Sequence, residues 1–237
     1  MPFNRSVFST RVTTSFFFVV VMLTALLWND ISFWMLMVVI HAGCWIEYQK
    51  IIQGFRHALL YILLGLVYIT LSWVLFLDLY YSTFYHASTG LTAPAWAQWP
   101  LVVFVFMWIN DTMAYLVGTS IGKTPLSSIS PKKTWEGTIG GILLTLLAGG
   151  SIADFLLGDL LMRGQLTPID SYHWYLIALL AAIAGTLGDL LESKLKRMAG
   201  IKDSGSILPG HGGFLDRFDS ILITTPAVWL YIRMFLS

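Results

Sequence analysis

Charged residues, which the rest of the chain avoids, gather in residues 188–219, which read GDLLESKLKRMAGIKDSGSILPGHGGFLDRFD. Asp189, Ser193 and Lys196 are separated by four and three residues, so a helix would place them on one face, where they can converge on one ligand. The LPGHGG stretch at residues 208–213 predicts a turn whose glycines let backbone N–H groups approach an anion closely. Carboxylates, cations and a glycine-rich turn together indicate magnesium-dependent phosphate chemistry.

Asp189 and Asp216 are the best magnesium ligands in this segment. Magnesium prefers oxygen ligands and is usually held by one or two carboxylates together with substrate phosphates, while Lys and Arg offset the remaining phosphate charge. The structural alternative is a solvated helix end, at which Asp189 and Glu192 pair with Lys196 and Arg197, and a glycine turn that merely connects two spans. We favour the functional interpretation for Asp189, because ionisable groups inside an apolar run are costly, and the structural one for Glu192 alone.

A second polar cluster, NDTMAYLVG at residues 110–118, lies late in another apolar run. Asn110 and Asp111 are the strongly polar residues of that run, and Tyr115 follows Asp111 by four residues, on the same helix face. Two interpretations stay open. The cluster forms a polar pocket among the helices, or it makes an interhelical hydrogen bond of about 0.6–2 kcal/mol that only holds the bundle together.

The loop after this cluster contains SPKKTWEG at residues 130–137. Lys132 and Lys133 stand just ahead of a helix predicted to begin near Thr134, and a helix N-terminus with two lysines suits phosphate binding. The positive charge of an ordinary cytoplasmic loop would explain the lysines but not the Trp-Glu-Gly that follows them. We therefore favour the functional interpretation.

His211 lies in the glycine turn, where it would position backbone or bind phosphate rather than act as a base. His41 and the nearby WIEY of residues 45–48 need no function, since a polar residue and an aromatic belt at a span end account for them. No P-loop, zincin, α/β-hydrolase or Rossmann motif fits its required structural context. The chemistry thus rests on the three clusters above.

Membrane helices must position these clusters. The 237 residues are 57% hydrophobic and 11% charged, with a mean hydropathy of +0.73, which excludes a soluble globular domain, intrinsic disorder, collagen and a coiled coil. We expect an all-α integral membrane protein, a polytopic bundle of about seven transmembrane helices in one domain, with N-terminal helices in residues 1–98 and the catalytic helices and loops in 99–237. The apolar runs place the spans at residues 12–28, 32–49, 57–78, 99–118, 137–157, 174–192 and 220–236.

The distribution of positive charge predicts the orientation of this bundle. With the N-terminus inside and the C-terminus outside, 12 of the 14 Lys and Arg residues fall in cytoplasmic segments, and only Arg163 and Arg233 fall outside. Residues 80–100 carry no Lys or Arg and are rich in aromatic residues, as expected of a non-cytoplasmic loop. This orientation puts the loops that carry the clusters on the cytoplasmic side, and we expect the bundle to have a polar cavity open to the cytoplasm.

Residues 193–219 resemble the signature of the phosphatidate cytidylyltransferases, also called CDP-diacylglycerol synthases. The family pattern is Ser, then Lys-Arg, Lys-Asp, a Leu-Pro-x-His-Gly-Gly turn and Asp-Arg-x-Asp. Every position is filled here, by Ser193, Lys196, Arg197, Lys202, Asp203, residues 208–213, Asp216, Arg217 and Asp219. The clusters at residues 110–111, 130–137 and 188–193 also resemble the family, so the likeness covers roughly residues 100–237. The N-terminal third is shorter than in many members, and we expect one or two peripheral helices to be missing.

The resemblance implies that phosphatidic acid and CTP give CDP-diacylglycerol and pyrophosphate, with Mg²⁺ required and K⁺ as an optional assisting cation. The metal ligands implied are Asp189 and Asp216, joined by Asp219. The catalytic residues implied are Asp189, Ser193, Lys196, Lys202 and Asp216. The substrate-binding residues implied are Asn110, Asp111, Lys132, Lys133, Arg197, His211, Gly212, Gly213 and Arg217.

The expected partners are CTP, phosphatidic acid and membrane lipids, with no nucleic acid and with a homodimer as one candidate assembly. We expect a multi-pass protein of a bacterial plasma (inner) membrane, with its active site facing the cytoplasm, where CTP is. Three alternatives stay open. They are a CTP-dependent transferase for another membrane lipid, a phosphate or nucleotide transporter with Asp111 and Asp189 along its pathway, and a non-catalytic lipid-binding scaffold.

Overall fold

The computed structural model describes residues 5–86, 98–155, 169–205 and 212–236, and every extended element in these ranges is a helix. The all-α expectation is therefore confirmed for this part of the chain. The elements are α1 (Arg5–Leu27), α2 (Asp30–Ile52), α3 (Ala58–Gly65), the π-helical stretch η1 (Leu66–Leu71), α4 (Ser72–His86), α5 (Gln98–Ile121), α6 (Trp135–Leu144), the π-helical stretch η4 (Thr145–Gly149), α7 (Gly150–Ile152), α8 (Ser171–Met198) and α9 (Leu215–Phe235).

Within the described ranges, five helical segments are long and apolar enough to cross a membrane. They are Asp30–Ile52, Ala58–Tyr81, Trp99–Ile121, Trp135–Phe155 and Ser171–Met198, and they coincide with the second to sixth predicted spans. The first predicted span lies in α1, whose apolar stretch Phe16–Leu27 is shorter, and the seventh lies in α9. A polytopic helical membrane protein is thus supported, while the count of seven spans, the orientation and the cytoplasmic cavity stay predictions.

The chain forms two compact units that alternate along the sequence. The first unit comprises Met1–Leu71 and Leu191–Asp219, and the second comprises Ser72–Leu190 and Ser220–Ser237. Helices α8 and α9 each contribute residues to both units. Each unit is described by itself below.

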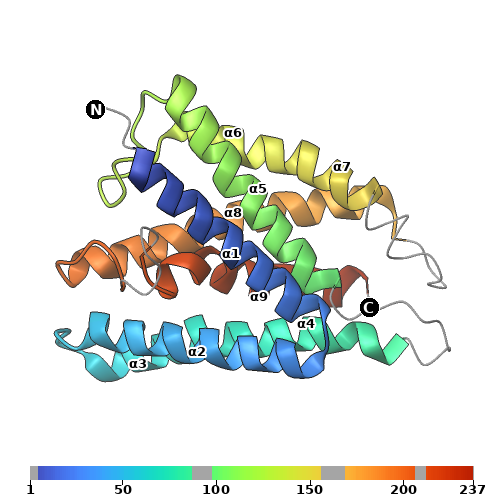
Figure 1. Ribbon diagram of the computed structural model, residues 1–237, viewed down its shortest axis with the longest axis horizontal. Coiled ribbons are helices and arrows are strands. Elements are labelled where there is room, and N and C mark those ends of the chain that lie inside the picture. The colour runs from blue at the N-terminus through green and yellow to red at the C-terminus, as the bar shows by residue number, and fades with distance from the viewer. Residues whose placement is uncertain (1–4, 87–97, 156–168, 206–211, 237) are drawn as a thin grey trace. The chain divides into compact units, whose positions relative to one another are not determined.

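In the first unit, α2 and α3 form a helical hairpin (Figure 1). Asn29 caps α2 by accepting a hydrogen bond from the Ser32 N–H at 2.9 Å. Gly65 lies so close to α2 that a Cβ atom there would stand 2.6 Å from the Tyr48 ring. The hairpin is further closed by the Tyr48 hydroxyl, which donates to the Tyr61 carbonyl at 2.7 Å.

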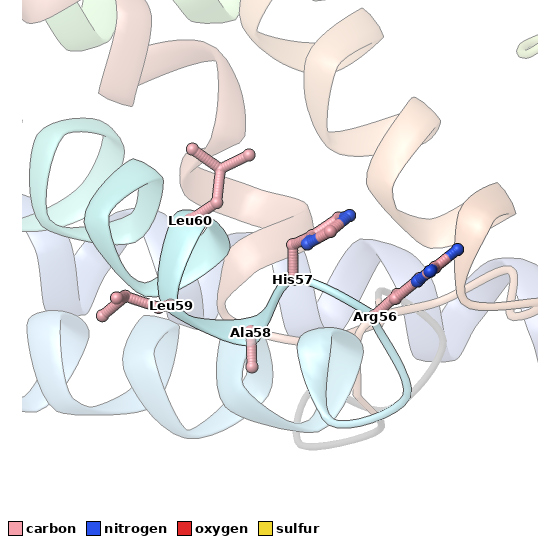
Figure 2. Close-up of a pocket in the computed structure, with 5 residues that line it drawn as sticks. All are labelled: Arg56, His57, Ala58, Leu59 and Leu60. Atoms are coloured by element: carbon pink, nitrogen blue, oxygen red, sulfur yellow. The ribbon is translucent and has the colours of Figure 1, made fainter.

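The turn of this hairpin is basic. Figure 2 shows the Arg56 and His57 side chains lying beside one another, at a surface hollow of about 530 Å³ that Ala58, Leu59 and Leu60 also line. Arg56 and His57 directly precede the apolar segment Ala58–Tyr81. This order of residues is typical of a loop at the membrane surface.

In the second unit, α5 packs against α6 through small residues (Figure 1). A Cβ atom at Gly137 would stand 2.7 Å from the Ala114 carbonyl oxygen, and one at Gly141 would stand 2.8 Å from the Ala114 Cβ. Small residues allow such close backbone approach between membrane helices. The Thr134 hydroxyl caps α6 by accepting from the Gly137 N–H at 3.1 Å, which confirms the predicted helix start near Thr134.

We expect Gly137→Ala to lower the free energy of unfolding by about 1–3 kcal/mol, because the neighbouring atoms are α5 backbone and cannot move aside alone. The matched control is Gly54→Ala, where a Cβ would meet nothing within 4 Å. Thermal unfolding in detergent measures both variants. Equal midpoints for the two variants would contradict this account of the α5–α6 contact.

Candidate active site

Asp216, in the first turn of α9, is held by the segments that precede it in the first unit. Its Oδ2 accepts hydrogen bonds from the backbone N–H groups of Ser204 at 2.9 Å and Gly213 at 2.8 Å. Gly212 has a φ of +83°, and a Cβ atom there would meet the Asp216 carboxylate. A left-handed backbone against a side chain favours glycine at this position. The Gly213 N–H, predicted to bind phosphate, thus donates to Asp216 in this structure.

One ammonium group links this carboxylate to α8. Lys196 Nζ lies 2.5 Å from Asp216 Oδ1 and also forms an ion pair with Glu192, one helical turn earlier. The side chains of Lys196, Glu192 and Asp216 are 11%, 0% and 8% exposed. The alternative of a solvated helix end is therefore wrong for Glu192 and Lys196, because their pair is buried.

The carboxyl of Asp216 is ionised at neutral pH. Burial alone would raise its pKa, but the hydrogen bond from Gly213 and the Lys196 ammonium outweigh burial and hold the pKa at about 2. A buried carboxylate with a fixed negative charge is suited to bind a cation.

Glu47, on α2, accepts hydrogen bonds from the backbone that leads into Asp216. Its Oε1 accepts from the Phe214 N–H at 3.0 Å, and its Oε2 accepts from the Leu215 N–H at 2.9 Å and from the Ser204 hydroxyl at 2.6 Å. The residue is 1% exposed. Glu47 is not among the predicted site residues, because an aromatic belt at a span end accounts for the WIEY segment. The signal was present, because an acidic residue inside an apolar span is the feature that singled out Asp189.

In the second unit, Lys133 forms an ion pair with Asp189, and both side chains are about one-third exposed. This ion pair joins the SPKKTWEG loop to the α8 carboxylate, although the two are distant in sequence. The loop itself is fixed by Glu136, whose carboxylate accepts from the Thr124 hydroxyl at 2.8 Å and from the Thr124 N–H at 3.2 Å. Lys132, next to this pair, is exposed.

The Asn110–Asp111 cluster is split between two environments. Asn110 is 4% exposed, and its Oδ1 accepts no hydrogen bond within the described ranges, whereas Asp111 and Tyr115 are exposed. A buried amide oxygen without a donor is rare and suits a polar ligand or water. The assignment of both residues to substrate binding stays a prediction.

The remaining predicted residues lie near the end of α8, in the segment after it, and in the first turns of α9. Ser193 and Asp219 are buried, while Lys202 and Arg217 are exposed. Arg197 is exposed and donates from Nη1 to the Ile201 carbonyl at 3.0 Å. His211 lies outside the described residues.

Comparison with known proteins identifies the family of this chain. The profile of the Cytidylyltransferase family matches residues 92–235, which is more than half of the chain. The chain belongs to the cytidylyltransferase family. All the predicted site residues fall within the matched region, whereas Glu47 precedes it.

Several relatives of this chain carry the name phosphatidate cytidylyltransferase. The protein of that name from Bacillus subtilis is 44% identical over 132 residues, which are 55% of this chain and 46% of that protein. The one from Synechocystis is 42% identical over 136 residues, or 57% of this chain and 43% of that protein. The one from Staphylococcus aureus strain COL is 35% identical over 197 residues, or 78% of this chain and 70% of that protein. The chain thus spans less than half of the first two relatives and more than two-thirds of the third.

The carboxylates present fit magnesium by donor chemistry. Within the described ranges, no three His, Cys, Asp or Glu side chains are grouped to form a metal cage. Magnesium does not need one, because it is usually held by one or two carboxylates plus substrate phosphates and water. Asp189 and Asp216 each lie beside a lysine, which can contact a phosphate next to the metal.

We expect Lys196→Met to lower the free energy of unfolding by about 3–5 kcal/mol, because Glu192 and Asp216 would lose the cation buried with them. The matched control is Lys194→Met, an exposed lysine on the same helix. Thermal unfolding in detergent compares the two. A control as unstable as Lys196→Met would show that the buried ion pairs do not set the difference.

Proposed function

We propose that the protein transfers a cytidylyl group from CTP to phosphatidic acid, forming CDP-diacylglycerol and releasing pyrophosphate. The observation that carries this proposal is the contact between Lys196, a buried lysine in the last turn of α8, and the Asp216 carboxylate, which lies beside a glycine turn at the start of α9. Family membership and the name shared by the relatives support it. The substrates and partners proposed are CTP, phosphatidic acid and the surrounding membrane lipids, and a homodimer is one candidate assembly.

The reaction joins two anions. A phosphate oxygen of the lipid attacks the α-phosphorus of CTP, the bond from that phosphorus to the bridging oxygen of the β-phosphate breaks, and pyrophosphate leaves with the electron pair. The lipid supplies the nucleophile, so the protein needs no covalent intermediate. Its work is to hold attacking and leaving oxygens in line and to neutralise their charge.

Cationic side chains around both carboxylates perform the neutralisation. Lys196 contacts Asp216, and Arg217 follows Asp216 in sequence. Lys133, beside Asp189, and the exposed Lys132 extend positive charge over the SPKKTWEG loop. We assign the phosphates of CTP and of the lipid to these groups and to Arg197, Lys202, His211 and Gly212.

Asp189 and Asp216 would hold Mg²⁺, with Asp219 as a third carboxylate and K⁺ as an optional second cation. When bound, Mg²⁺ would withdraw negative charge from the triphosphate and orient it. Ser193, buried one helical turn after Asp189, is assigned to a phosphate oxygen. The orientation predicted from the Lys and Arg distribution would put the site on the cytoplasmic side of a bacterial plasma membrane, with the lipid tails remaining in the bilayer.

We expect purified wild-type protein to release pyrophosphate only when CTP, phosphatidic acid and magnesium are all present. Asp216→Asn should lower the rate by about 100-fold or more, because it removes a fixed charge at the reacting phosphates. The matched control, Asp30→Asn at the start of α2, should retain activity. An enzyme-coupled pyrophosphate assay measures all three proteins.

Three other outcomes of this assay would contradict the proposal in different ways. Full activity of Asp216→Asn would overturn the metal assignment. Release that needs a different lipid phosphate would identify a related CTP-dependent transferase. No release with any lipid phosphate, from protein shown to be folded, would favour a transporter or a lipid-binding scaffold.

A further inference from the structure

We propose that Glu47 is a positioning residue for the transfer reaction, which fixes the backbone that carries Asp216 and Arg217 without touching substrate. This inference rests on the proposed function, because it assigns to Asp216 the role given there. Glu47 lies on α2, 45 residues before the region that the family profile matches. The site would therefore include a helix that neither the signature motifs nor the profile covers.

The contacts of Glu47 show what it holds. Its two carboxylate oxygens accept from the N–H groups of Phe214 and Leu215 at 3.0 and 2.9 Å, which lie at the very start of α9. The first N–H groups of a helix have no partner within the helix, and a negative charge is favourable there. At 1% exposure, Glu47 is closed to substrate and metal, so its effect on them must pass through the residues it holds.

Ser204 links Glu47 to Asp216 by hydrogen bonds. The Ser204 hydroxyl donates to Glu47 at 2.6 Å and accepts from the Asp216 N–H at 3.3 Å, while the Ser204 N–H donates to the Asp216 carboxylate at 2.9 Å. Glu47 and Asp216 thus share one intermediate residue in addition to the helix start. Displacing the Glu47 carboxylate would weaken both connections to Asp216, the one through Ser204 and the one through the start of α9.

Two glycines show how closely the backbone surrounds Glu47. A Cβ atom at either Gly205 or Gly213 would overlap the Glu47 carboxylate oxygens. Gly213 also donates to Asp216, so one residue contacts the positioning carboxylate and the proposed metal ligand together. This fit leaves Glu47 little freedom, as precise positioning of a reacting group requires.

The test is Glu47→Gln, which keeps the shape but replaces one acceptor oxygen by an NH₂ donor. Because a donor cannot accept from a backbone N–H, the bond to Phe214 or the bond to Leu215 is lost. We expect kcat/KM for CTP, per folded protein, to fall about 10- to 100-fold, as for a displacement of about 1 Å at a reacting centre. Amide hydrogen exchange at residues 213–216 should accelerate at least 10-fold.

The matched control is Asp78→Asn, which alters another helix carboxylate that accepts hydrogen bonds, here from Trp229 Nε1 and Arg233 in the second unit. It should lower the unfolding temperature while kcat/KM and exchange at residues 213–216 stay within twofold of wild type. Glu47→Gln behaving in this same way would overturn the proposal, because Glu47 would then be merely structural.

Ser204→Ala covers the case in which Glu47→Gln does not fold. It removes the hydroxyl bridge alone, so we expect a smaller fall in kcat/KM, about 3- to 10-fold, and faster exchange at the Asp216 amide. Unchanged values for Ser204→Ala would overturn the proposed route. If wild type transfers no cytidylyl group, the proposed function fails, and amide exchange alone decides whether Glu47 holds the turn.

Discussion

The buried ammonium group of Lys196, shared between Glu192 and Asp216, is the interaction on which the candidate site depends. Charged groups among apolar helices are tolerated only when they are paired and hydrogen-bonded. This requirement ties the end of α8 to the start of α9, because the two carboxylates come from these two helices. Asp216 then has one oxygen left to accept from the backbone of Ser204 and Gly213, which fixes the path of the chain around it.

Glycine makes this compact arrangement possible. Gly212 takes a left-handed conformation, and Gly205 and Gly213 approach the Glu47 carboxylate more closely than any side chain would allow. Glycines also allow close backbone approach in the second unit, where Gly137 and Gly141 let α6 pack against α5. The start of α6 is thereby fixed, and with it the loop from which Lys133 reaches Asp189. Close backbone approach, rather than large side chains, positions the charges in both units.

The sequence predicted the features that depend on neighbouring residues, namely the positions of the helices and the start of α6. Hydropathy located the helices, since five predicted spans coincide with membrane-length helices, and the residues around Thr134 predicted the start of α6. Pairings between distant segments were not predictable, because helical spacing reports only on neighbours along one helix. Lys133 as the partner of Asp189 and Glu47 as the support of α9 both fall in this class. The burial of Glu192 was not predicted for a related reason, since it depends on residues elsewhere in the chain.

The proposed reaction transfers the cytidylyl group of CTP, which includes its α-phosphate, to a lipid phosphate. Two parallel reactions of purified wild-type protein with phosphatidic acid and magnesium test it directly, one with α-labelled and one with γ-labelled CTP. We expect the α-label to enter a chloroform-soluble lipid and the γ-label to stay in water as pyrophosphate. Label from the γ-position in the lipid, or no labelled lipid from either nucleotide, would contradict it.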